Sequence, residues 1–183
     1  MSESDTAHIR LFGEVSSERV HRLIDTVERK LSEGMSRLVL LVSSPGGKVA
    51  AGISGYNFLK GIPAEVITYN FGNADSIAAV LYCAGAKRYC APHGRFLLHG
   101  VVTNLQTGRY DEKVLRDRIT SLESDRGVIS RIIAETCGQP VERVEQDMLQ
   151  GRMLTAQEAL GYGLVHEIRA QIVEPGVQVI AVQ

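Results

Sequence analysis

The sequence predicts one domain of the α/β class, because predicted strands alternate with predicted helices along the chain. Apolar runs such as Leu38–Val42 are typical of buried strands, and segments at helical spacing follow them. No internal repeat, low-complexity tract or linker divides the 183 residues. We therefore expect a single domain over residues 1–183, with a polar N-terminal segment at 1–7 and a C-terminal extension at 171–183.

The first half of the chain contains two predicted strand–helix units. His8–Val15 alternates apolar and polar residues like a strand, and the spacing of apolar residues over Val20–Leu31 predicts a helix. Leu38–Val42 predicts a buried strand that ends in the glycine turn Ser43–Gly47. A second helix is expected over Lys48–Lys60.

The middle of the chain repeats this pattern with smaller residues. Val66–Phe71 is a predicted strand, and the Ala-rich stretch Asp75–Ala86 is a predicted helix, for which Asp75 is the better cap. Two short strands are expected at Lys87–Ala91 and Arg95–His99.

The last third combines helices with one or two strands. A polar loop at Thr103–Gly108 precedes a long charged helix over Arg109–Cys137, whose charge pattern indicates a solvated or interfacial position. The further predicted elements are a helical stretch at Val141–Leu149, a helix opened by a capping box at Thr155, a strand at Leu164–Ile168, and a possible added strand at Val177–Val182. The added strand would pair with a neighbour or cover a sheet edge.

Composition and charge exclude several classes of protein. Hydrophobic residues make up 44% of the chain and charged residues 22%, close to the globular average. A net charge of −1 favours neither nucleic acid nor an anionic membrane as a partner. The sequence lacks the run of about 18 apolar residues that a membrane span needs, and its polar start indicates a cytoplasmic protein. Three cysteines without metal-ligand spacing predict neither a zinc site nor a disulfide framework.

Three features that could carry chemistry each follow a predicted strand: the glycine turn Gly46–Gly47, Ser76 and His99. The ends of strands in an α/β sheet form a common edge, so these features are expected to meet. A serine in the first turn of a helix lies beside free N–H groups, and the Ile77 N–H could hold an oxyanion there. Each residue also has an ordinary explanation, as a helix cap, a turn or a partly buried histidine.

The glycine turn has alternative interpretations that the residues alone do not separate. The phosphate-binding patterns with Gly-Lys-Ser/Thr or Gly-x-Gly-x-x-Gly are missing at Gly46–Gly47. Glycine permits close approach of the backbone to a ligand, either as a second oxyanion donor or as an edge on which a peptide pairs.

Four motifs together resemble the Clp protease proteolytic subunit family, over a match from about His8 to Ile168. They are SSPGG (43–47), GNADSIAA (72–79), LLHG (97–100) and TAQEALGYGLV (155–165). The resemblance implies a crotonase-like spiral of strand–helix units with a long protruding handle helix, here Arg109–Cys137. It implies a serine endopeptidase without a cofactor, with Ser76 as nucleophile, His99 as general base, and the Gly47 and Ile77 N–H groups as the oxyanion hole.

The resemblance also implies partners. The substrate would be a short peptide or an unfolded protein, cleaved inside a homo-oligomeric ring, a heptamer that stacks as a tetradecamer through the handles. Only seven residues precede His8, fewer than in the segment with which the family meets an ATP-dependent unfoldase. Docking to such an unfoldase therefore stays open.

One catalytic position departs from the family pattern, because the family's catalytic aspartate aligns with Gly151. Loss of this acid from a serine protease triad costs roughly 10⁴-fold in rate. Asp147 could replace it, with Asp111 and Asp125 as more distant candidates, or a backbone carbonyl or water could orient His99. Two alternatives to a peptidase follow: an inactive ring subunit or peptide-binding scaffold, and a crotonase-like acyl-thioester enzyme.

Overall fold

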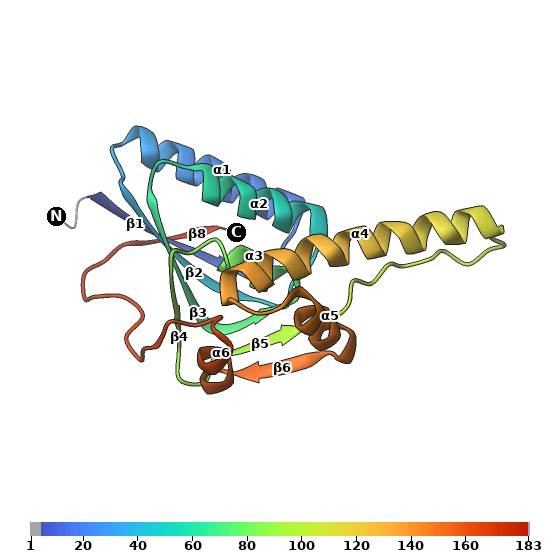
Figure 1. The fold of residues 1–183 in the computed structure, drawn as a ribbon. Helices are drawn as coiled ribbons and strands as arrows, with labels where there is room; N and C mark the ends of the chain where they lie inside the picture. Colours follow the sequence, from blue (N-terminus) through green and yellow to red (C-terminus); the bar gives the residue numbers. More distant parts are fainter. Residues whose placement is uncertain (1–4, 183) are drawn as a thin grey trace.

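The computed structural model describes residues 5–182, which form one eight-stranded sheet with helices packed against it (Figure 1). The strands are β1 (Thr6–Phe12), β2 (Arg37–Ser44), β3 (Glu65–Asp75), β4 (Lys87–Cys90), β5 (Arg95–Leu98), β6 (Arg152–Thr155), β7 (Glu167–Ile168) and β8 (Val179–Val182). The helices are α1 (Ser17–Ser32), α2 (Val49–Gly61), α3 (Ile77–Tyr82), α4 (Glu112–Cys137), α5 (Val141–Gln150) and α6 (Ala156–Tyr162). The predicted α/β class is confirmed.

Strand β3 is the centre of the sheet and is longer than the predicted Val66–Phe71. Strands β1, β2 and β3 are parallel neighbours, and the β2–β3 register shifts between Val42 and Ser44. The first part of β3 pairs with β4, whereas Asn73–Asp75 pairs with β5. The strand therefore changes partner just before it reaches Ser76.

Helix α3 differs from the predicted helix over Asp75–Ala86. It spans six residues, all of them buried, and Ser76 occupies its cap position. The prediction that Asp75 caps the helix is wrong, because Asp75 is the last residue of β3 and its side chain bonds within the sheet. The short helix thus begins directly at the candidate nucleophile.

Two glycines of α2 allow α3 to pack closely against it. A methyl group on Gly52 would come within 2.2 Å of Ile77 Cγ1, and one on Gly55 within 2.7 Å of Leu81 Cδ2. Helix α2 also lies beside α1 over the sheet (Figure 1). The position of Ile77 therefore depends on a residue without a side chain at Gly52.

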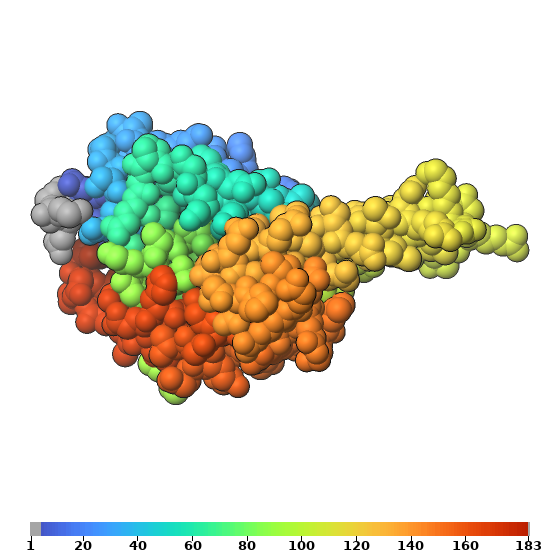
Figure 2. Space-filling view, viewed as in Figure 1, coloured from blue at the N-terminus to red at the C-terminus, as the bar shows by residue number. Residues whose placement is uncertain are grey.

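Helix α4 projects from the body of the molecule as an arm, as the handle predicted over Arg109–Cys137 would (Figures 1 and 2). Its cap is Asp111, whose carboxylate accepts from the Val114 N–H at 2.8 Å, and Gly138 ends it in the left-handed conformation. Apolar side chains on the arm and its leading loop are exposed: Val102, Leu105, Val114, Leu115 and Ile119. No helix within residues 5–182 is both long and apolar enough to span a bilayer.

The buried guanidinium of Arg88 joins the carboxyl ends of three helices. It donates to Gly85 O after α3, to Thr136 O in the last turn of α4, and to Gly163 O at the end of α6, at 3.1–3.2 Å. The His166 ring nitrogen Nε2 lies 2.8 Å from Arg88 Nη2. The negative ends of the three helix dipoles thus stabilise a cation that bonds to no carboxylate within residues 5–182.

The C-terminal extension returns to the sheet. After β7 the chain passes over the sheet face, and β8 pairs in parallel with β1, with Ile9 opposite Ile180. The added strand predicted at Val177–Val182 is confirmed as β8, and it covers the edge of its own sheet.

Candidate active site

Ser76 lies in a sharp turn between β3 and α3. Its φ of 58° and ψ of −129° make it the one non-glycine residue with positive φ among residues 5–182. Its N–H donates to Leu97 O of β5 at 2.7 Å, and its carbonyl accepts from Ala79 N at 3.0 Å. Such a conformation costs about 1–3 kcal/mol and persists only where its surroundings fix it. Strained residues of this kind occur mostly at functional sites.

The glycine turn lies directly against Ser76. A methyl group on Gly46 would come within 2.8 Å of Ser76 Cβ and 3.4 Å of its Oγ. Gly46 O accepts from Val15 N, and Lys48 N donates to Val15 O, at 2.7 and 2.8 Å. In this parallel bridge the Gly47 N–H is not used and points away from Val15.

The Ile77 N–H is the second candidate donor. Ile77 is the first residue of α3, where backbone N–H groups have no acceptor within the helix. Ile77 directly follows the residue whose hydroxyl would attack, which is where one oxyanion donor lies in the nucleophile-elbow arrangement. Both predicted donors therefore belong to segments that border Ser76.

His99 follows β5, the strand that pairs with the end of β3. The register places Asp75 opposite Leu97, so Ser76 and His99 follow the last paired residues of two adjacent parallel strands. The ring nitrogen Nδ1 of His99 lies 2.6 Å from Gly100 O. Across residues 5–182, no hydrogen bond joins the Ser76 hydroxyl to this ring. Without substrate, catalytic hydrogen bonds are often long and tighten only in the complex.

Asp147 makes no hydrogen bond to His99 within residues 5–182. Its two carboxylate oxygens accept from Arg152 Nη1 and from the Tyr162 hydroxyl, both at 2.8 Å. Burial and this carboxylate raise the pKa of Tyr162 above its ordinary range, which keeps the phenol protonated as a donor. Asp147 is thus a structural partner of α6 and β6. Asp111 caps α4, and Asp125 lies on the same helix. Neither bonds to His99 within the described part of the chain, where the ring bonds to Gly100 O.

Gly151, the position at which the resemblance places the catalytic aspartate, nevertheless lies close to the segment that contains His99 and Gly100. The Gly151 N–H donates to Met148 O at 3.2 Å, and a methyl group on Gly100 would lie 4.0 Å from the same oxygen. Gly151 has a φ of +68° and ends α5, with open space around the site of a side chain. Within residues 5–182, the hydrogen-bond partner of His99 Nδ1 is the neutral carbonyl of Gly100.

Sequence reasoning misses a charged cluster beside Ser76. Asp75, 5% exposed, accepts from Asn73 Nδ2 at 2.8 Å and from Arg95 Nη2 at 3.1 Å. Asn73 also bonds to Ser44 O and to the Ser43 hydroxyl. The signal is an aspartate directly before the serine, which the sequence alone presents as a helix cap.

Comparison with known proteins decides the family. The model of the Clp protease family matches residues 4–171. The chain belongs to the Clp protease family. The ATP-dependent Clp protease proteolytic subunit 2 of Thermobifida fusca is 35% identical over 158 residues, which cover 85% of this chain and 76% of that protein. Subunit 1 of Mycobacterium bovis is 34% identical over 163 residues, covering 87% and 80%.

A solved Clp protein confirms the fold. A point mutant of ClpP1 from Listeria monocytogenes superposes with a TM-score of 0.82 at 24% identity, covering 92% of this chain and 93% of that one. The predicted ClpP-like spiral of strand–helix units is therefore present in this Clp family member.

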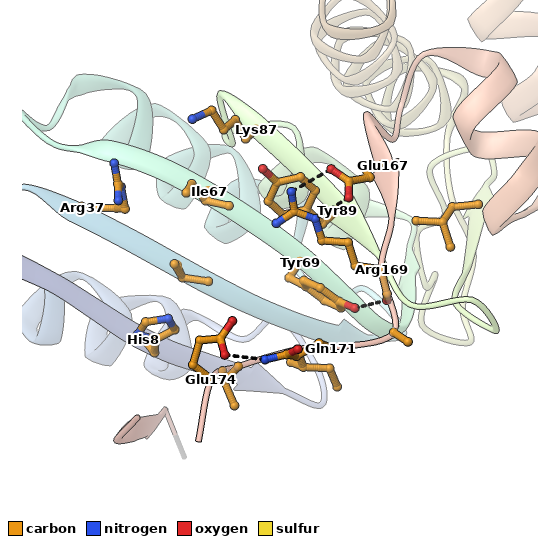
Figure 3. Close-up of a pocket in the computed structure, with 15 residues that line it drawn as sticks. His8, Arg37, Ile67, Tyr69, Lys87, Tyr89, Glu167, Arg169, Gln171 and Glu174 are labelled. Atoms are coloured by element: carbon orange, nitrogen blue, oxygen red, sulfur yellow. Dashed lines mark hydrogen bonds and ion pairs between the residues drawn. The ribbon is translucent and has the colours of Figure 1, made fainter. Parts of the chain in front are cut away.

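This Clp family member has two cavities that lie away from Ser76. These cavities, of about 600 and 870 Å³, lie between the sheet face and the C-terminal segment, and Figure 3 shows the one of about 600 Å³. The Tyr69 hydroxyl donates to Arg169 O there, and the Arg169 guanidinium lies 3.7 Å from the centre of the Tyr89 ring. The residues that line them come from β1, β2, β3 and β4, from the chain around the end of α1, and from residues 167–180; none of the four predicted site residues is among them.

Proposed function

We propose that this chain is a serine endopeptidase of the Clp proteolytic-subunit type. Ser76 would be the nucleophile, His99 the general base, and the Gly47 and Ile77 N–H groups the oxyanion donors. The observation that carries the proposal is the strained Ser76 turn, seated against Gly46 at the start of α3. A turn of this kind exposes a hydroxyl beside free backbone N–H groups.

The chemical steps follow the serine-protease scheme. Ser76 Oγ bonds to the peptide carbonyl carbon while His99 Nε2 takes the hydroxyl proton, and the carbonyl oxygen becomes an oxyanion held by two N–H groups. His99 returns the proton to the departing amine as the C–N bond breaks. Water then repeats the attack on the acyl ester and releases Ser76.

The third group in this scheme is a backbone carbonyl. With the proton on Nδ1, His99 donates to Gly100 O, which leaves Nε2 free to accept from the Ser76 hydroxyl. A neutral carbonyl stabilises the imidazolium less than a carboxylate does, so the chain would work as a slow dyad. The rate is expected up to about 10⁴-fold below that of a full triad.

A fluorophosphonate probe tests the nucleophile. We expect modification of Ser76 alone, lost in Ser76→Ala and strongly slowed in His99→Gln. Ser54→Ala is the matched control, because Ser54 is an exposed serine of α2 that donates to Ala50 O. A folded wild-type sample that the probe leaves unmodified would contradict the proposal.

A second function, an inactive ring subunit or peptide-binding scaffold, is favoured by one observation. The resemblance aligns the family's catalytic acid with Gly151, and the hydrogen-bond partner of His99 Nδ1 within residues 5–182 is a backbone carbonyl, Gly100 O. This alternative predicts an assembled particle without hydrolysis of an unstructured peptide. A peptidase rate that disappears in Ser76→Ala would eliminate it.

Assembly belongs to the same proposal. The projecting arm carries exposed apolar residues, among them Val114 and Ile119, which suit burial against a second copy. We propose a cytoplasmic homo-oligomer, a heptameric ring that stacks in pairs and encloses peptide or unfolded protein substrates. The relatives from Thermobifida and Mycobacterium are named ATP-dependent, so an unfoldase is a candidate partner. Light scattering measures the particle mass.

A further inference from the structure

An ion pair between a buried aspartate, Asp75, and the half-exposed Arg95 lies directly before the strained serine. The Asp75 side chain is only 7% exposed, and its Oδ2 accepts from Arg95 Nη2 on β5 at 3.1 Å. The same oxygen accepts from Asn73 Nδ2, two residues earlier on β3, at 2.8 Å. Asp75 therefore bonds across the strand pair that ends in Ser76 and His99.

The cluster connects three strands at the point where the regular ladder is interrupted. The β2–β3 pairing passes from Val42 opposite Asn70 to Ser44 opposite Ala74, so β3 carries extra residues there. Asn73 spans the gap, because its Nδ2 donates to Ser44 O at 2.9 Å. Side chains thus replace the backbone bonds that the irregular stretch lacks.

A carboxylate at this position is not explained by packing. Asp75 Oδ1 is buried without a hydrogen-bond partner among residues 5–182. A buried charge with an unpartnered oxygen is costly, and an apolar side chain of similar volume would avoid that cost. The stability of the fold therefore does not explain the aspartate at this position, and another role has to account for it.

The backbone strain at the next residue, Ser76, supplies such a role. Ser76 keeps its unusual backbone conformation only if its surroundings fix it. Its own N–H is held by Leu97 O of β5. The Asp75 side chain ties the preceding residue to the same strand through Arg95, so two contacts to β5 fix the entry to the turn.

We propose that Asp75 and Arg95, braced by Asn73, form a positioning pair that holds the Ser76 hydroxyl in its attacking geometry. This inference rests on the proposed peptidase function. Asp75 and Arg95 do not touch the reacting atoms; they act through the backbone of Ser76. A nucleophile displaced by about 1 Å can lose about 100-fold in rate, so the pair controls kcat rather than substrate binding.

The test compares Asp75→Asn, Arg95→Gln and the double variant in the full-length assembled protein. We expect each single variant to slow fluorophosphonate labelling of Ser76 and the kcat of peptide hydrolysis by about 10–100-fold, with KM changed less than about twofold. The double variant should be no slower than either single one, because the two residues act as a unit. Arg95→Lys keeps the charge and should recover part of the rate.

Glu65→Gln is the matched control. Glu65 begins the same strand β3 and pairs with Arg37 and Lys87, so its loss also removes a cross-strand ion pair. We expect a change in melting temperature comparable to that of Asp75→Asn, but wild-type labelling. Rates are measured well below the melting temperature of every variant.

The outcomes separate the two proposals. If wild type labels at Ser76 and the Asp75 and Arg95 variants label equally fast, the positioning role is wrong and the peptidase proposal stands. If Glu65→Gln slows labelling as much as Asp75→Asn, the role is merely structural and the inference is overturned. If wild type is never labelled, the proposed function fails and the positioning role fails with it.

Discussion

Gly46 and Ser76 touch: any side chain on Gly46 would begin 2.8 Å from Ser76 Cβ and 2.9 Å from Asp75 O. The turn after β2 and the turn after β3 are therefore built as one unit. Gly46 also has a φ of +97°, which favours glycine independently of the contact. A change in the backbone of one of these two turns, which carry the candidate oxyanion donors, would therefore also change the other turn.

Two replacements of Ser76 distinguish the cost of its backbone strain from the loss of its hydroxyl. Ser76→Gly relieves the positive φ, whereas Ser76→Ala keeps it, and both remove the hydroxyl. After the entropy cost of glycine, we expect Ser76→Gly to be more stable than Ser76→Ala by about 1 kcal/mol. Chemical denaturation measures the difference in the free energy of unfolding. Equal stability would show that the turn carries no stored strain.

Gly52 and Gly55 form a natural pair of test positions on α2. Gly52→Ala forces a methyl group into Ile77 Cγ1, next to the candidate oxyanion donor, and should cost about 1–3 kcal/mol of stability. Gly55→Ala meets the flexible end of Leu81, and helix propensity offsets much of the contact. We expect Gly52→Ala to slow Ser76 labelling and Gly55→Ala to leave it near wild type. The reverse order would contradict the role given to Ile77.

Gly151→Asp introduces the acid that the resemblance implies for this position. The new Cβ meets no atom within 4 Å, but the φ of +68° costs roughly 1 kcal/mol for a non-glycine residue. A carboxylate that reaches Nδ1 of His99 replaces a neutral acceptor by a charged one, so we expect peptide hydrolysis to rise at least about tenfold. Gly151→Asn is the control, with similar shape and no charge. Equal rates in both variants would exclude the charge effect.

Acid should weaken the fold through His166. Burial, and then the nearby Arg88 guanidinium, lower the pKa of His166 below its ordinary value of 6.5. The folded state therefore favours the neutral ring, and its contribution is complete above about pH 6.5 and lost as the pH falls through the lowered pKa. Melting temperatures at pH 7 and pH 5 should differ less in His166→Gln than in wild type. An unchanged difference would contradict this assignment.

Much of the fold could be predicted from the sequence, and the reasons are visible in particular elements. Leu38–Val42 and Val20–Leu31 carry clear strand and helix periodicities, and both segments lie within elements of the predicted type. The extension of β3 to Asp75 could not be predicted, because side-chain bonds from Asn73 replace an apolar pattern there. Strand β6 could not be predicted either, since its sequence, Arg152–Thr155, does not alternate apolar and polar residues and its last residue also forms the capping box of α6.

The candidate site could be predicted in outline but not in its details. Strand ends predict that Ser76, His99 and the glycine turn gather at one sheet edge, and the register agrees. The sequence leaves the partner of His99 open among an acid, a carbonyl and water. A contact to the next residue in the chain, Gly100 O, leaves no spacing pattern from which it could be inferred.

The pairing of β8 with β1 changes which part of the molecule is prone to aggregate. Without β8, the seven residues of β1 would present a row of unsatisfied backbone groups to solvent. With it, the outermost strand has four residues. A shorter rim offers fewer positions at which a foreign chain can add itself, which matters for a protein expected to handle unfolded polypeptides.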